Sequence, residues 1–201
     1  MRLVTTHDWR EPVDVDHIAA IRRDAWRHAV GGVVHLVLEV LAYALDEAAE
    51  GSTREICVTL HPDGSVSVAD DGRGTDTRRD SEGVWVVKPV IATRDVRFFG
   101  EPSAPSLPDG LPREGMSVVA ALTAWLVHTN VRHDTAWSAR YEKGVPVGLP
   151  VSVGAGGPTG TIVHLMPDPT IFDDHLDVDS LSASIATIEG PATIHLVDER
   201  A

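Results

Sequence analysis

The segment 66–75 constrains the fold most strongly, because it reads Val-Ser-Val-Ala-Asp-Asp-Gly-Arg-Gly-Thr. Its valines alternate with small residues, which is the period of a half-buried strand, and the strand would end at Asp70. Gly72 and Gly74 then allow the backbone to turn and to come close to a ligand. A carboxylate at this place can accept a hydrogen bond from an amine, and Arg73 can lie over an aromatic ring. The alternative is a tight Asp-Gly hairpin turn, so this segment alone leaves both interpretations open.

A long helix is predicted over 32–50, where good helix formers are continuous and proline is absent. Polar side chains recur every four residues and share one face of this helix: His35, Glu39, Tyr43 and Glu47. The other faces are apolar, so we expect a helix buried on most sides whose polar stripe faces a cavity, a partner or solvent. His35 and Glu39, one turn apart, form a pair that can polarise a water molecule.

Several ordered segments resemble the ATPase domain of bacterial gyrase B proteins, within the gyrase, Hsp90, histidine-kinase and MutL (GHKL) superfamily. Residues 39–48 read Glu-Val-Leu-Ala-Tyr-Ala-Leu-Asp-Glu-Ala, where the family has roughly Glu-Val-Val-Asp-Asn-Ser-Ile-Asp-Glu-Ala. Residues 115–123 read Gly-Met-Ser-Val-Val-Ala-Ala-Leu-Thr, similar to the family's Gly-Val-Ser-Val-Val-Asn-Ala-Leu-Ser. The resemblance covers about residues 31–200 in order. The other segments that carry it are 56–74, 140–146 and 159–168.

The resemblance implies roles for residues on the catalytic and adenine sides of an ATP site. Glu39 matches the general base that activates the attacking water, and His35 matches its helper. Asp70 matches the carboxylate that binds the adenine amine, and Thr161 matches the threonine that completes this contact. Arg73 matches the arginine that stacks on the base. The adenine half of the pocket is therefore expected to be present.

The same resemblance implies further contacts around the nucleotide. Glu47 and Arg132 match an ion pair beside the base. Gly72 and Gly74 match the turn that follows the adenine carboxylate, and Gly115 matches a retained glycine of the phosphate lid. We therefore expect ATP or another adenine nucleotide as the ligand.

The phosphate half departs from the family pattern. Tyr43 stands where the family has the asparagine that coordinates magnesium, and a phenol cannot replace an amide oxygen at the same reach. The lid segment 110–115 reads Gly-Leu-Pro-Arg-Glu-Gly instead of Gly-Leu-His-Gly-Val-Gly. Pro112 has no N–H and Glu114 brings negative charge, whereas Arg113 can supply a cation to a phosphate. These changes argue against a magnesium site, and we assign no metal ligand.

The predicted architecture is an α/β (α+β) two-layer sandwich, with helices on a mixed, mostly antiparallel sheet, which is the Bergerat fold of the GHKL ATPases. Further helices are expected over 17–30, 84–93, 117–126 and 179–189. The helix over 84–93 is implied by the resemblance alone, whereas Pro89 and the β-branched residues of this run favour a strand. Strands are expected near 55–60, 65–70, 126–131, 136–142, 150–153, 160–166 and 192–197.

The length of 201 residues suits one domain. We expect an N-terminal arm and short helix over 1–30, and a gyrase-B-like ATP-binding domain over 31–201 without a transducer domain. The arm does not match the family arm that embraces a second copy of the chain, so it does not support a dimer, although a dimer stays possible. An unknown protein partner is possible as well.

The net charge of −13 argues against direct DNA binding, because that binding relies on cations that neutralise phosphates. The sequence has no apolar run long enough to cross a membrane, and its first ten residues lack the apolar core of a signal peptide. Cys57 is the only cysteine, so no intramolecular disulfide can form. These features predict a cytoplasmic protein.

Three functional hypotheses follow. The first is a stand-alone, gyrase B-like adenine-nucleotide binding domain whose ATP hydrolysis is weakened or absent because of Tyr43 and the altered lid. The second is a working magnesium-dependent ATPase with a rearranged metal site. The third is a non-enzymatic interaction module that keeps the GHKL fold for its surface. The adenine-side residues favour binding over a scaffold, and Tyr43 and the altered lid argue against catalysis, so the first is our leading hypothesis.

Overall fold

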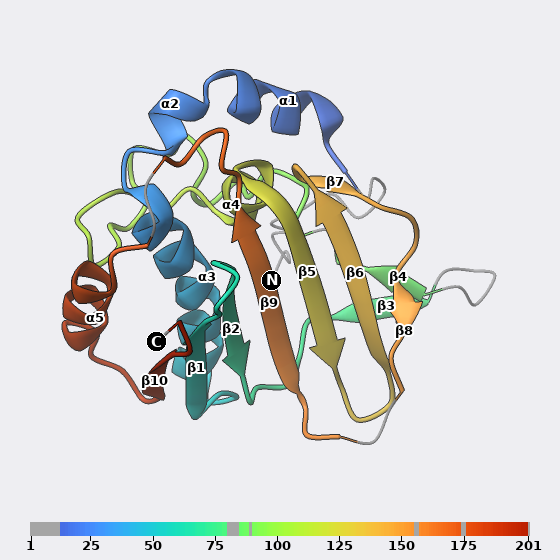
Figure 1. Cartoon of the computed structure of the whole chain (residues 1–201). Helices are drawn as coiled ribbons and strands as arrows, with labels where there is room; N and C mark the ends of the chain where they lie inside the picture. The colour runs from blue at the N-terminus through green and yellow to red at the C-terminus, as the bar shows by residue number, and fades with distance from the viewer. Residues whose placement is uncertain (1–12, 80–84, 89, 155–156, 174–175, 201) are drawn as a thin grey trace.

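The computed structural model describes residues 13–79, 85–88, 90–154, 157–173 and 176–200. Within them, one eight-stranded sheet has the order β10-β1-β2-β9-β5-β6-β7, and β8 pairs with β6 (Figure 1). Neighbouring strands are antiparallel except for β1 and β10, which are parallel. The strands of this sheet are β1 (Glu55–Leu60), β2 (Val66–Asp70), β5 (Thr123–Val131), β6 (Ala136–Glu142), β7 (Val145–Pro146), β8 (Val151–Ser152), β9 (Gly160–Pro167) and β10 (Thr193–Asp198).

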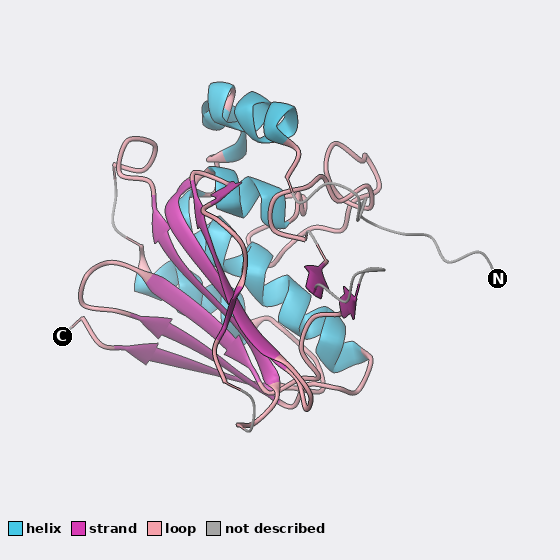
Figure 2. Ribbon diagram, turned by 90° about the vertical axis from the view of Figure 1, so that its right-hand side faces the viewer, coloured by secondary structure: helices cyan, strands magenta, loops and turns pink. Residues whose placement is uncertain are grey.

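Helices cover one face of the sheet, which gives the expected two-layer α+β sandwich (Figure 2). The long helix α3 lies against β2, and the short helix α4 packs beside α3 at the start of β5. α5 lies beside the end of the sheet that carries β10 (Figure 1). The described helices are α1 (Val15–Arg23), α2 (Ala25–His28), α3 (Gly32–Ala49), α4 (Met116–Ala121) and α5 (Val178–Ala186).

The core forms where α3 meets the inner face of the sheet. Val66 and Val68 of β2 are buried, whereas the residue between them is half-buried, as the alternating pattern predicts. Leu165 of β9 and Leu36 of α3 are completely buried in the same apolar cluster. This packing holds the polar stripe of α3 in a defined position relative to the ends of β2 and β9.

The N-terminal helix also belongs to this packed unit. Ile18 and Ile21 of α1 are buried in the same core. The Arg22 guanidinium lies 2.9 Å from the Asp168 carboxylate at the end of β9. The expected boundary at residue 30 therefore falls inside one packed body. The predicted arm over residues 1–12 lies outside the described residues.

The strand register brings Asp70 and Thr161 side by side. β2 lies between β1 and β9, and Asp70 is the direct partner of Thr161 across the β2–β9 ladder. Gly160, the residue before Thr161, has a φ of +152°. A Cβ at this position would lie 2.0 Å from the Asp70 carbonyl oxygen, so only glycine permits the two strands to meet this closely.

Three predicted helices were wrong in part. Residues 84–93 form no helix where they are described: Trp85–Val87 is strand β4, which pairs with β3 (Thr77–Arg79), because β-branched residues and Pro89 disfavour a helix here. The helix expected over 117–126 ends at Ala121, and the β-branched Thr123 begins β5. The helix expected over 17–30 is divided at Asp24 into α1 and α2.

No helix among the described residues is long and apolar enough to cross a membrane.

The core packing of β9 predicts a contrast between two substitutions on the same strand. Leu165→Ala should lower the free energy of unfolding by about 2–5 kcal/mol, because Leu165 is completely buried and its removal leaves a cavity. Ile162→Ala is the matched control, since Ile162 is 42% exposed on the other face, and it should cost about 1 kcal/mol or less. Urea denaturation measures both values. Equal losses would contradict the assigned facing of β9.

Candidate functional site

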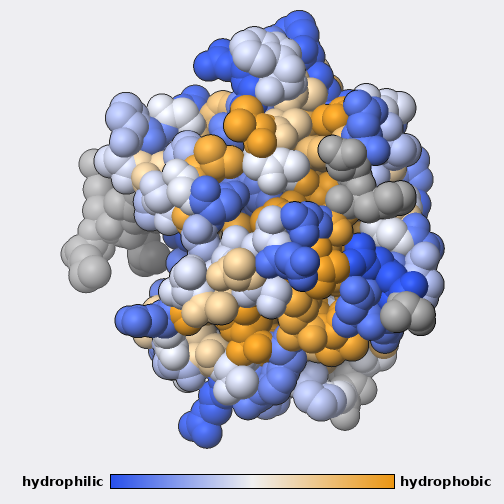
Figure 3. All heavy atoms as spheres, turned by 60° about the vertical axis from the view of Figure 1, so that its left-hand side comes forward, coloured by the Kyte–Doolittle hydropathy of each residue, from blue (hydrophilic) through white to orange (hydrophobic). Residues whose placement is uncertain are grey.

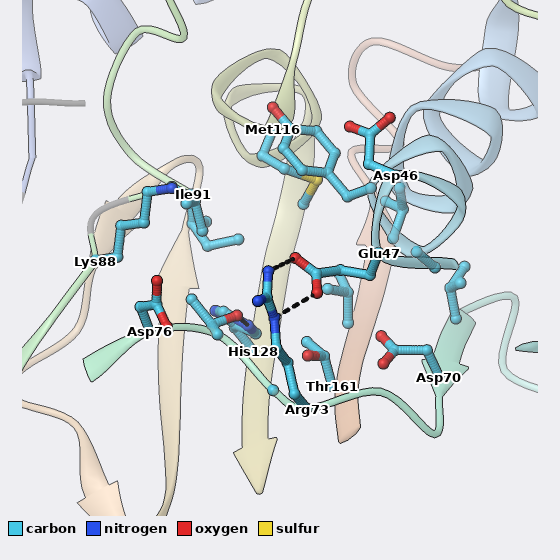
Figure 4. A pocket seen from close by; sticks show the side chains of 18 of the residues that line it. Asp46, Glu47, Asp70, Arg73, Asp76, Lys88, Ile91, Met116, His128 and Thr161 are labelled. Atoms are coloured by element: carbon cyan, nitrogen blue, oxygen red, sulfur yellow. Dashed lines mark hydrogen bonds and ion pairs between the residues drawn. The ribbon is translucent and has the colours of Figure 1, made fainter. Parts of the chain in front are cut away.

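A cavity of about 250 Å³ lies between α3 and the inner face of the sheet (Figure 4). α3 contributes Val40, Tyr43 and Glu47, and the sheet contributes Asp70 and Thr161 at the ends of two neighbouring strands. Most of the predicted nucleotide-binding residues therefore meet at one cavity: Tyr43, Glu47, Asp70, Arg73, Gly74 and Thr161 all line it. Gly72 lies beside it in the turn after Asp70.

The Asp70 carboxylate is oriented by the turn that follows it. Its Oδ1 accepts a hydrogen bond from the backbone N–H of Gly72 at 2.9 Å. Burial raises the pKa of Asp70 to about 6, although hydrogen bonds from the backbone of Gly72 and Thr161 oppose this shift. A Cβ on Gly72 would lie 2.8 Å from this carboxylate oxygen and 2.5 Å from Thr53 Oγ1. A side chain at position 72 would therefore displace the Asp70 carboxylate or the Thr53 hydroxyl.

Gly74 permits a second close approach on the same turn. Its φ is +75°, and a Cβ here would lie 2.6 Å from Asn130 Oδ1. The same Asn130 oxygen accepts the backbone N–H of Thr75 at 2.6 Å, which fixes the turn to β5. In the pattern Gly-Arg-Gly, the two glycines thus stand where a Cβ would collide with neighbouring atoms, and the arginine between them is exposed.

Arg73 forms the ion pair that was expected for Arg132. Its Nε lies 2.9 Å from Glu47 Oε2, and its Nη2 lies 2.8 Å from Glu50 Oε2. Arg132 instead donates from Nη1 to the Gly74 carbonyl at 3.0 Å. The predicted Glu47–Arg132 pair is therefore wrong in this conformation, because Arg73 on the neighbouring turn takes Glu47. Figure 4 shows the paired Arg73 and Glu47 side chains among those that line the cavity.

The predicted general base is separated from the cavity. Glu39 is completely buried and accepts hydrogen bonds from the backbone N–H groups of Glu114 and of Gly115, the latter at 3.1 Å. Burial raises the pKa of Glu39, although these bonds and the nearby His35 act in the opposite direction. Neither Glu39 nor His35 is among the residues that line the cavity. The predicted lid glycine, Gly115, thus binds a carboxylate of the chain itself.

His35 connects this base to the lid segment. Its Nε2 lies 3.6 Å from Glu39 Oε1, and its Nδ1 lies 2.7 Å from Asp109 Oδ2. The Asp109 side chain also accepts the backbone N–H of Leu111 at 3.1 Å. His35 therefore holds the lid segment down on α3, and its pairing with Glu39 agrees with the one-turn spacing in the sequence.

Tyr43 closes the end of the cavity nearest to Glu39. Its hydroxyl donates to Asp95 Oδ2 at 3.0 Å, and burial raises the pKa of this phenol above its ordinary value. The Arg113 guanidinium lies 4.4 Å from the centroid of the Tyr43 ring and 4.0 Å from that of Phe98. Arg113 is only 4% exposed, and its Nη2 lies 2.9 Å from Asp46 Oδ2. Aromatic rings and a paired cation thus fill this corner.

The residues at this corner do not fit a magnesium ion. The Tyr43 hydroxyl is committed as a donor to Asp95, and the Glu39 oxygens accept two backbone N–H groups. The Arg113 cation beside the Tyr43 ring would repel a second cation. In the part of the chain that the structure describes, no group of three histidine, cysteine, aspartate or glutamate residues is arranged to hold a metal.

Sequence reasoning missed Asp95, Phe98 and the buried position of Arg113. Asp95 and Phe98 lie in the irregular segment after β4, where no periodic pattern indicates which side chains turn inward. Arg113 was considered only as a phosphate ligand. The only sequence feature that could have indicated this contact is the presence of a tyrosine on α3 and an arginine in the lid segment, because these two side chains can stack.

A second cavity, of about 820 Å³, lies on the side of the molecule that carries α5. Its lining is mostly apolar and includes Leu60, Val66 and Phe172, and Figure 3 shows apolar side chains at the surface of this side. The charged residues there include Asp198 and Arg200, which are paired with each other at 2.9 Å. None of the predicted site residues lines this cavity.

The buried Asp70 predicts a pH-dependent difference in stability. The pKa of Asp70 rises to about 6 on folding, so the folded state binds a proton more tightly than the unfolded state. The stability gained from this protonation is complete below about pH 4 and is lost as the pH rises through 6. Relative to Asp70→Asn, which keeps an acceptor for Gly72, the wild type should therefore lose about 2–3 kcal/mol of unfolding free energy between pH 4 and pH 7. Urea denaturation at both pH values measures this, and a constant difference would contradict the raised pKa.

Comparisons with known proteins agree with the motifs. The chain is 36% identical over 176 residues to the DNA gyrase B protein of Mycobacterium leprae, which covers 84% of this chain and 26% of that protein. It is 38% identical over 144 residues to the DNA gyrase B protein of Thermotoga maritima, covering 71% of this chain and 23% of that protein. The chain thus spans about a quarter of the length of these relatives. No protein-family model matches it.

The fold has a solved counterpart. The topoisomerase IV ATP-binding domain of Francisella tularensis, solved in complex with a small-molecule inhibitor, has a TM-score of 0.66 and 25% sequence identity to this chain. The alignment covers 82% of this chain and 46% of that chain. Sequence and fold together place the chain with the GHKL-type ATP-binding domains of the gyrase B and topoisomerase IV kind.

Proposed function

We propose that the chain binds an adenine nucleotide in the cavity between α3 and the sheet, with Asp70 and Thr161 at the adenine. The observation that carries this proposal is the meeting of Asp70 and Thr161 at the inner end of a partly enclosed cavity. A buried carboxylate beside a strand-end threonine offers an acceptor for an exocyclic amine and a hydroxyl that can bind the base or a water. Val68 and Val163 supply apolar surface for the flat faces of a purine.

We propose further that ATP hydrolysis is weak or absent. A general base has to reach the attacking water, yet the Glu39 oxygens bind the backbone of Glu114 and Gly115 and lie outside the cavity lining. The backbone N–H groups that would bind phosphates are thereby occupied. Tyr43 and the buried Arg113 stand where phosphates and a metal would be needed. Hydrolysis would require the segment 109–115 to leave Glu39.

Substitution of the adenine carboxylate tests the first proposal. Asp70→Asn should abolish adenosine and adenine-nucleotide binding in calorimetry, because an amide presents an N–H group where the exocyclic amine needs an acceptor. Asp71→Asn is the matched control: Asp71 is exposed, does not line the cavity, and should leave binding unchanged. If the wild type binds no adenine compound at millimolar concentration, the chain is better explained as an interaction module that keeps the GHKL fold.

Phosphate release tests the second proposal. The wild type with ATP and magnesium should release phosphate no faster than Glu39→Gln, because Glu39 is held away from the cavity. Tyr43→Asn should increase the dependence of ATP binding on magnesium, whereas Tyr43→Phe, which keeps the ring, should not. Magnesium-dependent turnover that disappears in Glu39→Gln would instead establish a working ATPase with a rearranged metal site.

A further inference from the structure

Two cationic side chains that line the cavity were not identified by the sequence motifs. Lys88, which follows β4, and Arg97, in the segment after it, both line the cavity. Figure 4 shows Lys88 on the other side of the cavity from Asp70, with its side chain extended along the rim toward Ile91. A ligand that spans the cavity from Asp70 would therefore end near Lys88, and Arg97 is close enough to Lys88 to influence its charge.

The acidic side chains that line the cavity are already engaged. Glu47 and Glu50 bind Arg73, and Asp46 binds the buried Arg113. The remaining two carboxylates are bound as well: Asp76 lies 3.4 Å from Arg132 Nη1, and Asp70 accepts the Gly72 N–H at 2.9 Å. None of these carboxylates therefore forms an ion pair with Lys88.

The Lys88 side chain differs from its charged neighbours, since it forms no ion pair or hydrogen bond with any other residue that the structure describes. Partial burial lowers the pKa of Lys88, and the nearby Arg97 adds to this effect. Two like charges near one another at the rim of a partly enclosed cavity are unfavourable, and an anion placed between them would relieve this repulsion.

Arg97 is held in place while it lines the cavity. Its Nε donates to Asp95 Oδ1 at 3.0 Å and its Nη2 donates to Asp95 Oδ2 at 2.7 Å, and its guanidinium lies 4.5 Å from the centroid of the Phe98 ring. Asp95 is nearly completely buried and also accepts the Tyr43 hydroxyl. A guanidinium held this way has donors left over for a second anion and loses little side-chain entropy when it binds one.

The small cavity and the occupied backbone donors beside α4 favour a short anion. Its volume of about 250 Å³ is below the roughly 300–1,000 Å³ that is usual for small-molecule sites. At the other possible location for phosphates, the N–H groups of Glu114 and Gly115 bind Glu39. A long phosphate chain therefore finds no free backbone donors beside α4, which favours a short phosphate chain held by the two cations.

We propose that Lys88 and Arg97 form a phosphate-binding pair that holds an adenine nucleotide with one or two phosphates without a divalent cation. This inference rests on the proposed adenine site. The two protein cations take over the neutralising role that a magnesium ion has at many nucleotide sites, and each contributes charge-assisted hydrogen bonds to phosphate oxygens.

Calorimetry with the full chain tests the pair, using adenosine, AMP, ADP and ATP with and without magnesium. The wild type should bind AMP and ADP about tenfold more tightly than adenosine, as expected for charge-assisted hydrogen bonds, and magnesium should change these affinities little. Lys88→Gln should remove this preference and leave adenosine binding intact. Lys143→Gln is the matched control, because Lys143 is the other lysine of the chain and lies in the exposed β6–β7 turn.

The outcomes separate this inference from the adenine site. Equal binding of adenosine and AMP by the wild type, or an unchanged preference in Lys88→Gln, would overturn the phosphate pair and leave the adenine site standing. ATP binding that magnesium tightens more than tenfold would overturn it as well. If neither adenosine nor any adenine nucleotide binds, the adenine site itself is wrong, and the phosphate pair is overturned with it.

Discussion

The site depends on the hydrogen bonds that the buried Glu39 carboxylate accepts from the backbone of the lid segment. A carboxylate without exposure to solvent needs hydrogen-bond donors, and the backbone N–H groups of Glu114 and Gly115 provide them. These bonds connect the middle of α3 to the residues just before α4. His35 adds a second connection between α3 and the lid segment, through Asp109. The lid segment is thereby packed against α3, which leaves the cavity bounded by Tyr43 and removes Glu39 from it.

The attachment of the lid segment to α3 divides the site into two halves with different chemistry. The half that we propose to bind adenine has a carboxylate and a threonine on neighbouring strands, at a cavity with apolar walls. The other half has a stack of Tyr43, Arg113 and Phe98 in place of open backbone donors. Two further cations line the rim, on the segment after β4. Binding and hydrolysis are separable functions on such a fold, because recognition of the base and activation of water use different residues.

Much of the fold was predictable because local and tertiary preferences agree. The alternating valines of β2 and the apolar arcs of α3 encode burial directly, and both elements lie close to their expected bounds. The segment 84–93 was the clearest failure, since a family pattern favoured a helix while proline and β-branched residues favoured extended structure, and the local preference prevailed at Trp85–Val87. Asp70, Thr161 and Glu47 were predictable as cavity residues. Lys88 and Arg97 were not, because they lie outside any periodic element.

The sequence by itself determined which chemical groups are present: a strand-end carboxylate followed by two glycines, and a helix with polar residues at four-residue spacing that include two glutamates and a tyrosine. Only the tertiary structure decided which of these groups bind one another. Glu47 pairs with Arg73 rather than Arg132, and Glu39 binds the backbone of the lid rather than facing the cavity. The physical reason is that distance and burial in the folded chain decide which hydrogen bonds and ion pairs form. Glu39 and the lid residues it binds are 75 and 76 positions apart in the sequence, so only packing brings them together.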